Sequence, residues 1–139
     1  FSDPLRADYL NVVTTSSHDS STLRQWWCES PKLTQRYYEK QLGQAGDSPA
    51  QLTPELATEI IAQHLNSPAM LAIFPLQDLL ATSAHLVPAD PNIERINNPA
   101  NPKHRWNSRM SIGLEKLILA HEWNGKVREL IGRAQRITD

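Results

Sequence analysis

Two short apolar segments, residues 9–13 (YLNVV) and 69–74 (AMLAIF), most constrain the fold of this chain. The first is rich in residues that favour β-strands, and the second is continuously apolar, which is typical of a strand buried on both faces of a parallel sheet. Helical patterns separate and follow them, so the order of elements predicts an α/β fold with parallel strands. Two strands cannot bury both faces of a sheet by themselves. We therefore expect one part of a larger α/β structure, mostly helical when taken alone.

Helix start and stop signals divide the rest of the chain. A serine before Pro31 and a threonine before Pro54 each place an N-cap and a first-turn proline at the start of a helix. We expect the first of these, residues 31–42 with Ser30 as its cap, to end at Gly43. The other predicted segments are a helix at residues 22–27, the helix from Pro54 that ends before Pro68, a short helix at 76–80, a long proline- and asparagine-rich loop at 87–103, and helices at 112–119 and 125–137 separated by residues 123–125.

Charge and composition exclude several classes of partner. The 139 residues carry a formal net charge of −1, which gives no electrostatic reason to expect nucleic acid or an anionic membrane. The longest apolar stretch is far shorter than the roughly 20 residues that cross a bilayer. A single cysteine, Cys28, cannot form an intrachain disulfide, so we expect a reducing, cytoplasmic location. The chain opens with Phe1 and no signal-like segment, and we expect residues 1–139 to be a single piece of a longer protein.

A His-Asp pair follows the first predicted strand, inside the segment 14–27 (TTSSHDSSTLRQWW). At the carboxyl end of a barrel strand, an ionised Asp19 can accept hydrogen bonds from sugar hydroxyls, and these strengthen as an oxocarbenium-like transition state forms. His18 can donate to another hydroxyl. The spacing equally supports a second interpretation, in which Asp19, Ser20 or Ser21 is the N-cap of the following helix. Both interpretations stay open at this point.

Other residues also allow a structural and a functional interpretation. Trp26 and Trp27 could stack on sugar rings, but on an outer helix at least one of them must face the core. Cys28 has no second cysteine and no ligand-spaced histidine pair beside it in the sequence, which favours inert burial over a metal site or a thiol nucleophile. Asp78 follows the second strand, where it could act in a site or simply form a turn or a helix cap.

Four segments carry a resemblance to a known family. Residues 14–27 resemble the Thr-x-Ser-x-His-Asp-x-x-Thr-Leu-x-x-Trp-Trp segment of the 4-α-glucanotransferases, the amylomaltases or disproportionating enzymes of glycoside hydrolase family 77. Three more matches follow in the family's order, namely its eighth strand with a Pro-x-Gln-Asp turn at 69–80, its Arg-x-Asn-x-Pro loop at 94–99, and its His-x-Trp-x-aromatic-Arg segment at 104–109. Ser108 departs from the last pattern, where the family has an aromatic residue. Residues 101–104 (NPKH) are similar to the larger, plant-cytosolic-like disproportionating type.

The resemblance implies a fold, an activity and three site residues. The fold would be the C-terminal part of a (β/α)8 TIM barrel, about its last two strands. The whole enzyme would transfer α-1,4-glucan segments between malto-oligosaccharides by a retaining mechanism that needs no metal or organic cofactor. Asp19 falls on the carboxylate that stabilises the transition state, His18 on the adjacent sugar-binding histidine, and Asn97 on a loop that lines the substrate cleft. No segment resembles the family's nucleophile or its acid/base residue, so this piece alone is expected to be inactive.

Two alternatives compete with this assignment. One is a non-catalytic helical interaction module or carbohydrate-binding module, in which Asp19 is only a helix cap. The other is an α-glucan hydrolase of the same barrel clan with a similar His-Asp turn. Whether the whole protein is a glucanotransferase or a hydrolase of this barrel clan, the isolated piece would expose strand edges and apolar faces. We therefore expect it to self-associate.

Overall fold

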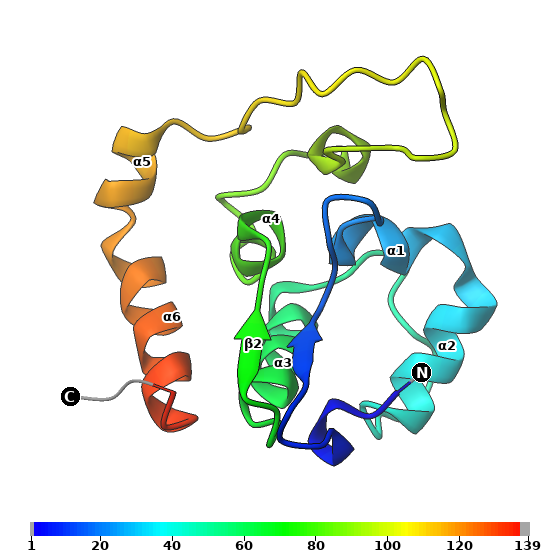
Figure 1. Cartoon of the computed structure of the whole chain (residues 1–139), viewed down its shortest axis with the longest axis vertical. Helices are drawn as coiled ribbons and strands as arrows, with labels where there is room; N and C mark the ends of the chain where they lie inside the picture. Colours follow the sequence, from blue (N-terminus) through cyan, green and yellow to red (C-terminus); the bar gives the residue numbers. More distant parts are fainter. Residues whose placement is uncertain (1, 137–139) are drawn as a thin grey trace.

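The computed structural model describes residues 2–136 and contains a pair of short parallel strands (Figure 1). Strand β1 (Val12–Thr14) pairs with β2 (Leu71–Ile73), with Val12 opposite Leu71 and Thr14 opposite Ile73. The predicted parallel pairing is therefore confirmed. The first strand begins later than predicted, because the chain turns at residues 9–10 before it joins the ladder.

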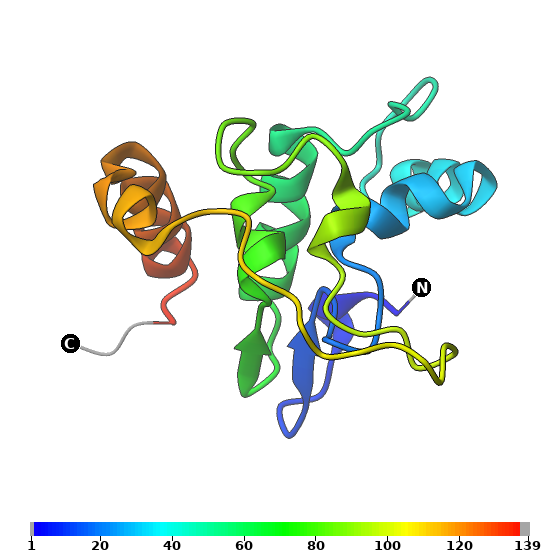
Figure 2. The same ribbon diagram turned by 90° about the horizontal axis from the view of Figure 1, so that it is seen from above.

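One face of the strand pair is covered and the other is bare. Helix α3 (Pro54–Leu65) lies over the covered face, as Figures 1 and 2 show together. On the opposite face Val12, Leu71 and Ile73 are 55%, 46% and 55% exposed. The predicted burial on both faces is therefore wrong, because Val13 and Ala72 on the covered face are partly buried and the other face is bare. An apolar bare face is what a strand pair taken from a larger sheet would present.

The main core lies between α3 and the helices that follow β1, which are α1 (Leu23–Glu29) and α2 (Pro31–Lys40). Thr53 caps α3 as predicted, since its Oγ1 accepts a hydrogen bond from Leu56 N at 3.3 Å. Ser30 is the N-cap residue of α2, as predicted, but its side chain makes no capping hydrogen bond. Gly43, with φ of 64°, follows α2 in the left-handed region that favours glycine. The buried residues of this core are Leu23, Trp27, Tyr37, Leu42, Leu52, Leu56, Ala57, Ile60 and Ala81.

The C-terminal half begins with α4 (Leu76–Leu80), directly after β2, as predicted. The long loop that follows contains the short 3₁₀ helix η2 (Pro91–Glu94). Helices α5 (Leu114–Leu119) and α6 (His121–Arg133) then run along the side of the molecule opposite α1 and α2 (Figures 1 and 2). No helix within residues 2–136 is long and apolar enough to span a bilayer.

The predicted break at residues 123–125 is wrong, because these residues lie inside α6 and the chain breaks at Ala120 instead. Trp123 is 9% exposed, and its indole N–H donates to Thr82 Oγ1 at 3.0 Å. Burial of this large side chain outweighs the poor helix propensity of Gly125. Helix α6 ends at Arg133, earlier than the predicted end at residue 137, which itself lies outside the described residues.

Candidate active site

The loop between β1 and α1, residues 15–22, carries His18 and Asp19. Because β1 and β2 are parallel, both strands end at the same edge, and the loop lies beyond that edge (Figure 1). Ser17 and Ser20 form a tight turn around the pair, in which the Ser17 N–H donates to Ser20 Oγ at 2.9 Å. The side chains of His18 and Asp19 are 55% and 53% exposed. The pair is therefore presented to solvent at the strand ends, where barrel enzymes keep their active sites.

The structure brings the three predicted site residues together. Asn97 Nδ2 donates to Asp19 Oδ1 at 2.7 Å, across 78 residues of sequence. His18 Nε2 lies 3.4 Å from Asp19 Oδ2 on the other side of the carboxylate. Asp19 is thus flanked by one amide and one imidazole, while half of its side chain stays open to a ligand.

Trp106 joins this group, which we did not predict. The centroids of its ring and of the His18 ring are 5.2 Å apart, with an interplanar angle of 53°. Its side chain is 66% exposed. An exposed aromatic ring beside an exposed carboxylate suits the apolar face of a sugar. The signal in the sequence was its place in the segment 104–109, which we used only for the family resemblance.

Asp19 is not the cap of α1. The N-cap is Thr22, whose Oγ1 accepts from Gln25 N at 3.3 Å, and the N–H of Leu23 is bound by Asp78. The prediction that Asp19, Ser20 or Ser21 caps this helix is therefore wrong for all three. A helix cap no longer explains why a carboxylate stands at position 19.

Asp78 is fully buried at the start of α4, and its carboxylate accepts three hydrogen bonds. Thr15 Oγ1 and Ser16 Oγ donate to its Oδ2 at 2.6 and 2.5 Å, and Leu23 N donates to its Oδ1 at 2.7 Å. The capping role that we considered for Asp78 is thus present, but it serves α1, a helix 55 residues earlier in the chain.

Glu94, at the end of η2, is a second buried carboxylate beside α1. It accepts a hydrogen bond from Thr22 Oγ1 at 2.9 Å and forms an ion pair with Arg24. Burial raises the pKa of Glu94 above its usual value, and the hydrogen bonds from Arg24 and Thr22 oppose that shift. The loop that carries Asn97 is in this way attached directly to the N-terminus of α1.

Arg95 fixes the next part of this loop. Its Nε donates to Asn97 O at 2.9 Å, and its Nη1 donates to Ser21 Oγ at 3.1 Å. On the other side, His104 Nε2 lies 2.9 Å from Ile96 O, to which an imidazole nitrogen can only donate. Ser108, the departure from the family pattern, donates to Arg95 O at 3.3 Å. Asn97 is therefore held by backbone and side-chain contacts on both sides.

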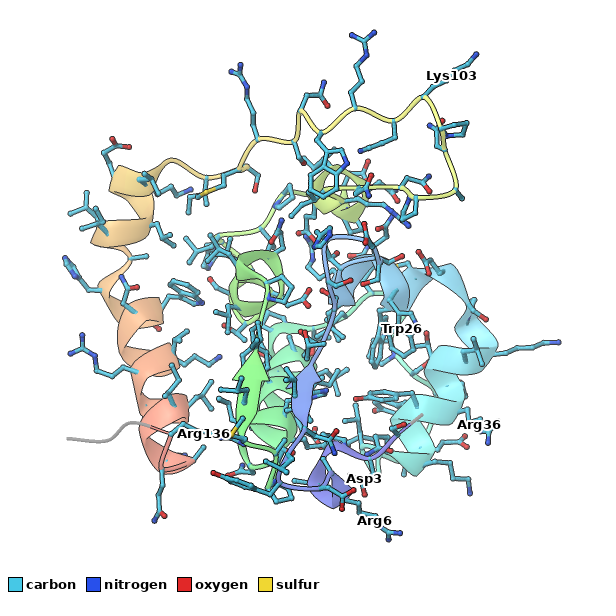
Figure 3. All side chains as sticks on the ribbon, in the orientation of Figure 1. Asp3, Arg6, Trp26, Arg36, Lys103 and Arg136 are labelled. Carbon is cyan, nitrogen blue, oxygen red and sulfur yellow. The ribbon has the colours of Figure 1, made fainter. Side chains whose placement is uncertain are left out.

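Helix α1 also carries Trp26, Trp27 and Cys28, for which the sequence left structural and functional interpretations open. Trp27 is buried in the core, and its indole N–H donates to Pro49 O at 2.8 Å, whereas Trp26 is partly buried between α1 and α2 (Figure 3). Cys28 is exposed, so the prediction of its burial is wrong. It follows Trp27 on α1 and falls on the outer side of that helix. Among residues 2–136, no group of three or more His, Cys, Asp and Glu side chains could hold a metal ion.

This arrangement can bind and polarise a hydroxylated ligand but does not complete an acid/base pair. Retaining glycoside chemistry needs two carboxyl groups about 5 Å apart on either side of the scissile bond. Asp78 and Glu94 are buried and saturated with hydrogen bonds, so neither can attack or protonate a sugar. Asp19, whose carboxylate is half exposed, remains accessible to a ligand.

Comparisons with known proteins agree with the motifs. The sequence pattern of the family described as 4-alpha-glucanotransferase, glycoside hydrolase family 77, matches residues 1–115. The chain is 38% identical over 136 residues to 4-alpha-glucanotransferase DPE2 of Oryza sativa subsp. japonica, covering 98% of this chain and 14% of that protein. It is 35% identical over 133 residues to the 4-alpha-glucanotransferase of Chlamydia pneumoniae, covering 92% of this chain and 24% of that protein. The chain thus spans a minor part of each relative, and it belongs to the 4-alpha-glucanotransferase family, glycoside hydrolase family 77.

Proposed function

We propose that residues 1–139 are the C-terminal part of the (β/α)8 barrel of a 4-α-glucanotransferase and contribute about its last two strands. The parallel strand pair, its bare apolar face and the loops at its carboxyl edge support this placement. The whole enzyme transfers α-1,4-glucan segments between malto-oligosaccharides with retention of configuration. Residues 101–104 (NPKH), which are similar to the plant-cytosolic-like disproportionating type, support that type and, with it, a cytoplasmic location.

The hydrogen bond between Asn97 and Asp19 carries the site assignment. Two family motifs that are 78 residues apart in sequence meet on one exposed carboxylate that caps no helix. In the whole enzyme, Asp19 accepts hydrogen bonds from ring hydroxyls of the sugar being transferred, and these bonds strengthen as positive charge develops at the anomeric carbon. His18 and Asn97 bind the same sugar and keep the carboxylate oriented.

The remaining chemistry belongs to other parts of the enzyme. One carboxylate attacks the anomeric carbon and forms a glycosyl-enzyme intermediate, while a carboxylic acid protonates the leaving glucan. A hydroxyl of an acceptor glucan then replaces water in the second step, which regenerates the enzyme and gives a longer chain. This piece alone is inactive and, with its bare strand face, self-associates. A monodisperse monomer in light scattering would contradict the self-association.

Asp19→Asn in the whole enzyme tests the proposal. We expect glucose release from maltotriose to fall by at least about 10³-fold, because charge stabilisation at the transition state is lost, while the thermal midpoint stays unchanged. Asp47→Asn makes the same chemical change at an exposed residue in the loop after α2 and should leave activity intact. Near-normal activity of Asp19→Asn would contradict the assignment. Wild-type products longer than maltotriose indicate transfer, whereas glucose and maltose alone would indicate the alternative hydrolase.

A further inference from the structure

The buried carboxylate of Asp78 accepts hydrogen bonds from two parts of the chain, the residues that follow β1 and the first residue of α1. Burying an ionised carboxylate is unfavourable unless hydrogen bonds replace its water. Asp78 is 0% exposed and receives three such bonds, all between 2.5 and 2.7 Å. Distances this short are typical of charge-assisted hydrogen bonds.

The three donors stand at the two ends of one loop. Thr15 and Ser16 follow β1 immediately, and Leu23 is the first residue of α1. Between them lies the turn that carries His18 and Asp19. The start of the loop gains a further constraint from Thr14 Oγ1, which donates to Ser16 O at 2.6 Å. One side chain from α4, the helix that follows β2, therefore closes the loop that follows β1.

Asp19 has no packing of its own to fix its position. Its side chain is 53% exposed, and its backbone N–H makes a long bond of 3.3 Å to Ser17 Oγ. Its place relative to a bound sugar therefore depends on where the loop ends are anchored and on the bond from Asn97. A displacement of about 1 Å at such a group can lower a rate about 10²-fold.

The chemistry of the three donors requires a carboxylate of this length. Two hydroxyls and one backbone N–H all point at acceptor oxygens. Asparagine would present an amide NH₂ in place of one of those oxygens. Either both hydroxyls at Oδ2 would have to accept instead of donate, or the Leu23 N–H at Oδ1 would lose its acceptor. Glutamate would add a methylene to a site with no exposed surface.

We propose that Asp78 is a positioning residue for Asp19, which holds the catalytic loop at the strand edge by fixing Thr15, Ser16 and Leu23. The inference rests on the proposed function, since Asp78 acts only through Asp19. It touches neither the substrate nor the reacting atoms, so it supports the rate of the chemical step and not the binding of glucan chains.

Asp78→Asn in the whole enzyme is the first test, with maltotriose as substrate. We expect kcat to fall about 30- to 100-fold, while KM changes by less than about threefold because remote glucan contacts are retained. Asp3→Asn is the matched control. Asp3 also caps a helix start, by accepting from Leu5 N at 3.0 Å, but lies towards the amino-terminal side of the strand pair, away from the loop at its carboxyl edge (Figure 3). This control should keep wild-type kcat and KM.

A second variant keeps the carboxylate and removes its hydroxyl donors. Thr15→Val combined with Ser16→Ala frees the start of the loop and should lower kcat at least about tenfold with a similarly small change in KM. Unchanged kcat in both this variant and Asp78→Asn would overturn the inference. Failure of both variants to fold would also overturn it, since Asp78 would then serve the fold as a whole.

A double-mutant cycle separates positioning from a general structural role. If Asp78 acts through Asp19, adding Asp78→Asn to Asp19→Asn should lower the residual rate by no more than about threefold. The residual rate can be measured with α-maltosyl fluoride, whose leaving group needs no protonation. Multiplied losses would overturn the inference. Normal activity of Asp19→Asn alone would overturn the proposed function instead, which keeps the two failures distinct.

Discussion

The loop that carries Asp19 and the C-terminal helices α5 and α6 are attached to the molecule by different means. The loop and its neighbour around Asn97 are held by directional bonds to two buried carboxylates, Asp78 and Glu94. Helices α5 and α6 pack through a separate apolar cluster, with Trp123 among Leu80, Leu86 and Ile112, to which Lys126 and Arg136 add hydrogen bonds to backbone carbonyls. Hydrogen bonds fix distance and angle, whereas apolar burial is nondirectional. Directional hydrogen bonds are therefore needed to position an exposed polar loop, whereas apolar burial is sufficient to hold a helix in place.

Glu94→Ala should have the largest effect, because it breaks the polar attachment. Arg24, whose side chain is 13% exposed, would keep a buried charge without its partner. We expect a loss of about 3 to 5 kcal/mol in the local stability of α1, together with a fall in activity as the Asn97 loop is released. Amide hydrogen exchange of α1 in the whole enzyme measures the stability.

The matched control for that variant lies on α6. Glu129→Ala removes the same group from an ion pair with Arg133. The side chains of Glu129 and Arg133 are 58% and 75% exposed. The expected loss is about 0.5 kcal/mol or less, as for other exposed pairs within a helix. Equal losses of local stability for Glu94→Ala and Glu129→Ala would contradict the proposed difference between the attachment of the Asp19 loop and that of α6.

Trp123→Ala tests the apolar attachment. Removal of this buried indole should destabilise the packing of α6 by about 3 kcal/mol, and hydrogen exchange of α6 should rise accordingly. The specific activity of the folded enzyme should stay within about twofold of wild type. Trp123→Phe retains most of the apolar area and loses the bond to Thr82, so it should cost about 1 kcal/mol. A collapse of activity in the folded Trp123→Ala enzyme would show that α6 also positions the site.

Thr22→Ala should cost about 1 kcal/mol in the stability of α1, because it removes the N-cap and a donor to Glu94. Asp19→Asn should cost nothing measurable in the same hydrogen-exchange experiment. The pair therefore separates the helix cap from the candidate catalytic group. The opposite pattern, with Asp19→Asn fraying α1, would restore the capping interpretation of that residue.

The smallest effect concerns His64 on α3, whose Nδ1 lies 2.8 Å from Ile60 O. Burial lowers the pKa of His64 below its usual value. The folded state therefore keeps it neutral where the unfolded chain takes up a proton, and stability falls as the pH drops from the unfolded pKa towards the lowered one. Between about pH 8 and about pH 5, the thermal midpoint of the wild type should fall more than that of His64→Gln. Parallel pH profiles for the two proteins would contradict the prediction.

Local sequence signals were reliable where a single segment decides its own structure. Thr53 before Pro54 marked the start of α3, and the alternation of apolar runs with helical patterns indicated parallel strands. The same kind of reasoning identified Ser30 as the N-cap residue of α2 but not the absence of its side-chain bond. It failed at Gly125, which lies inside α6 close to the buried Trp123. Propensity is a weak guide wherever a large side chain is buried nearby.

The sequence by itself determined which segments are strands and helices and which motifs this chain shares with the family, because periodicity, caps and motif residues are local. Only the tertiary structure decided that Thr22 and not Asp19 caps α1, that Asn97 contacts Asp19, and that Asp78 anchors the loop between them. The contacts made by Asn97 and Asp78 join residues 55 to 78 positions apart. No local pattern encodes such pairings, because they arise when parallel strands bring their carboxyl ends to one edge and buried carboxylates must find donors there.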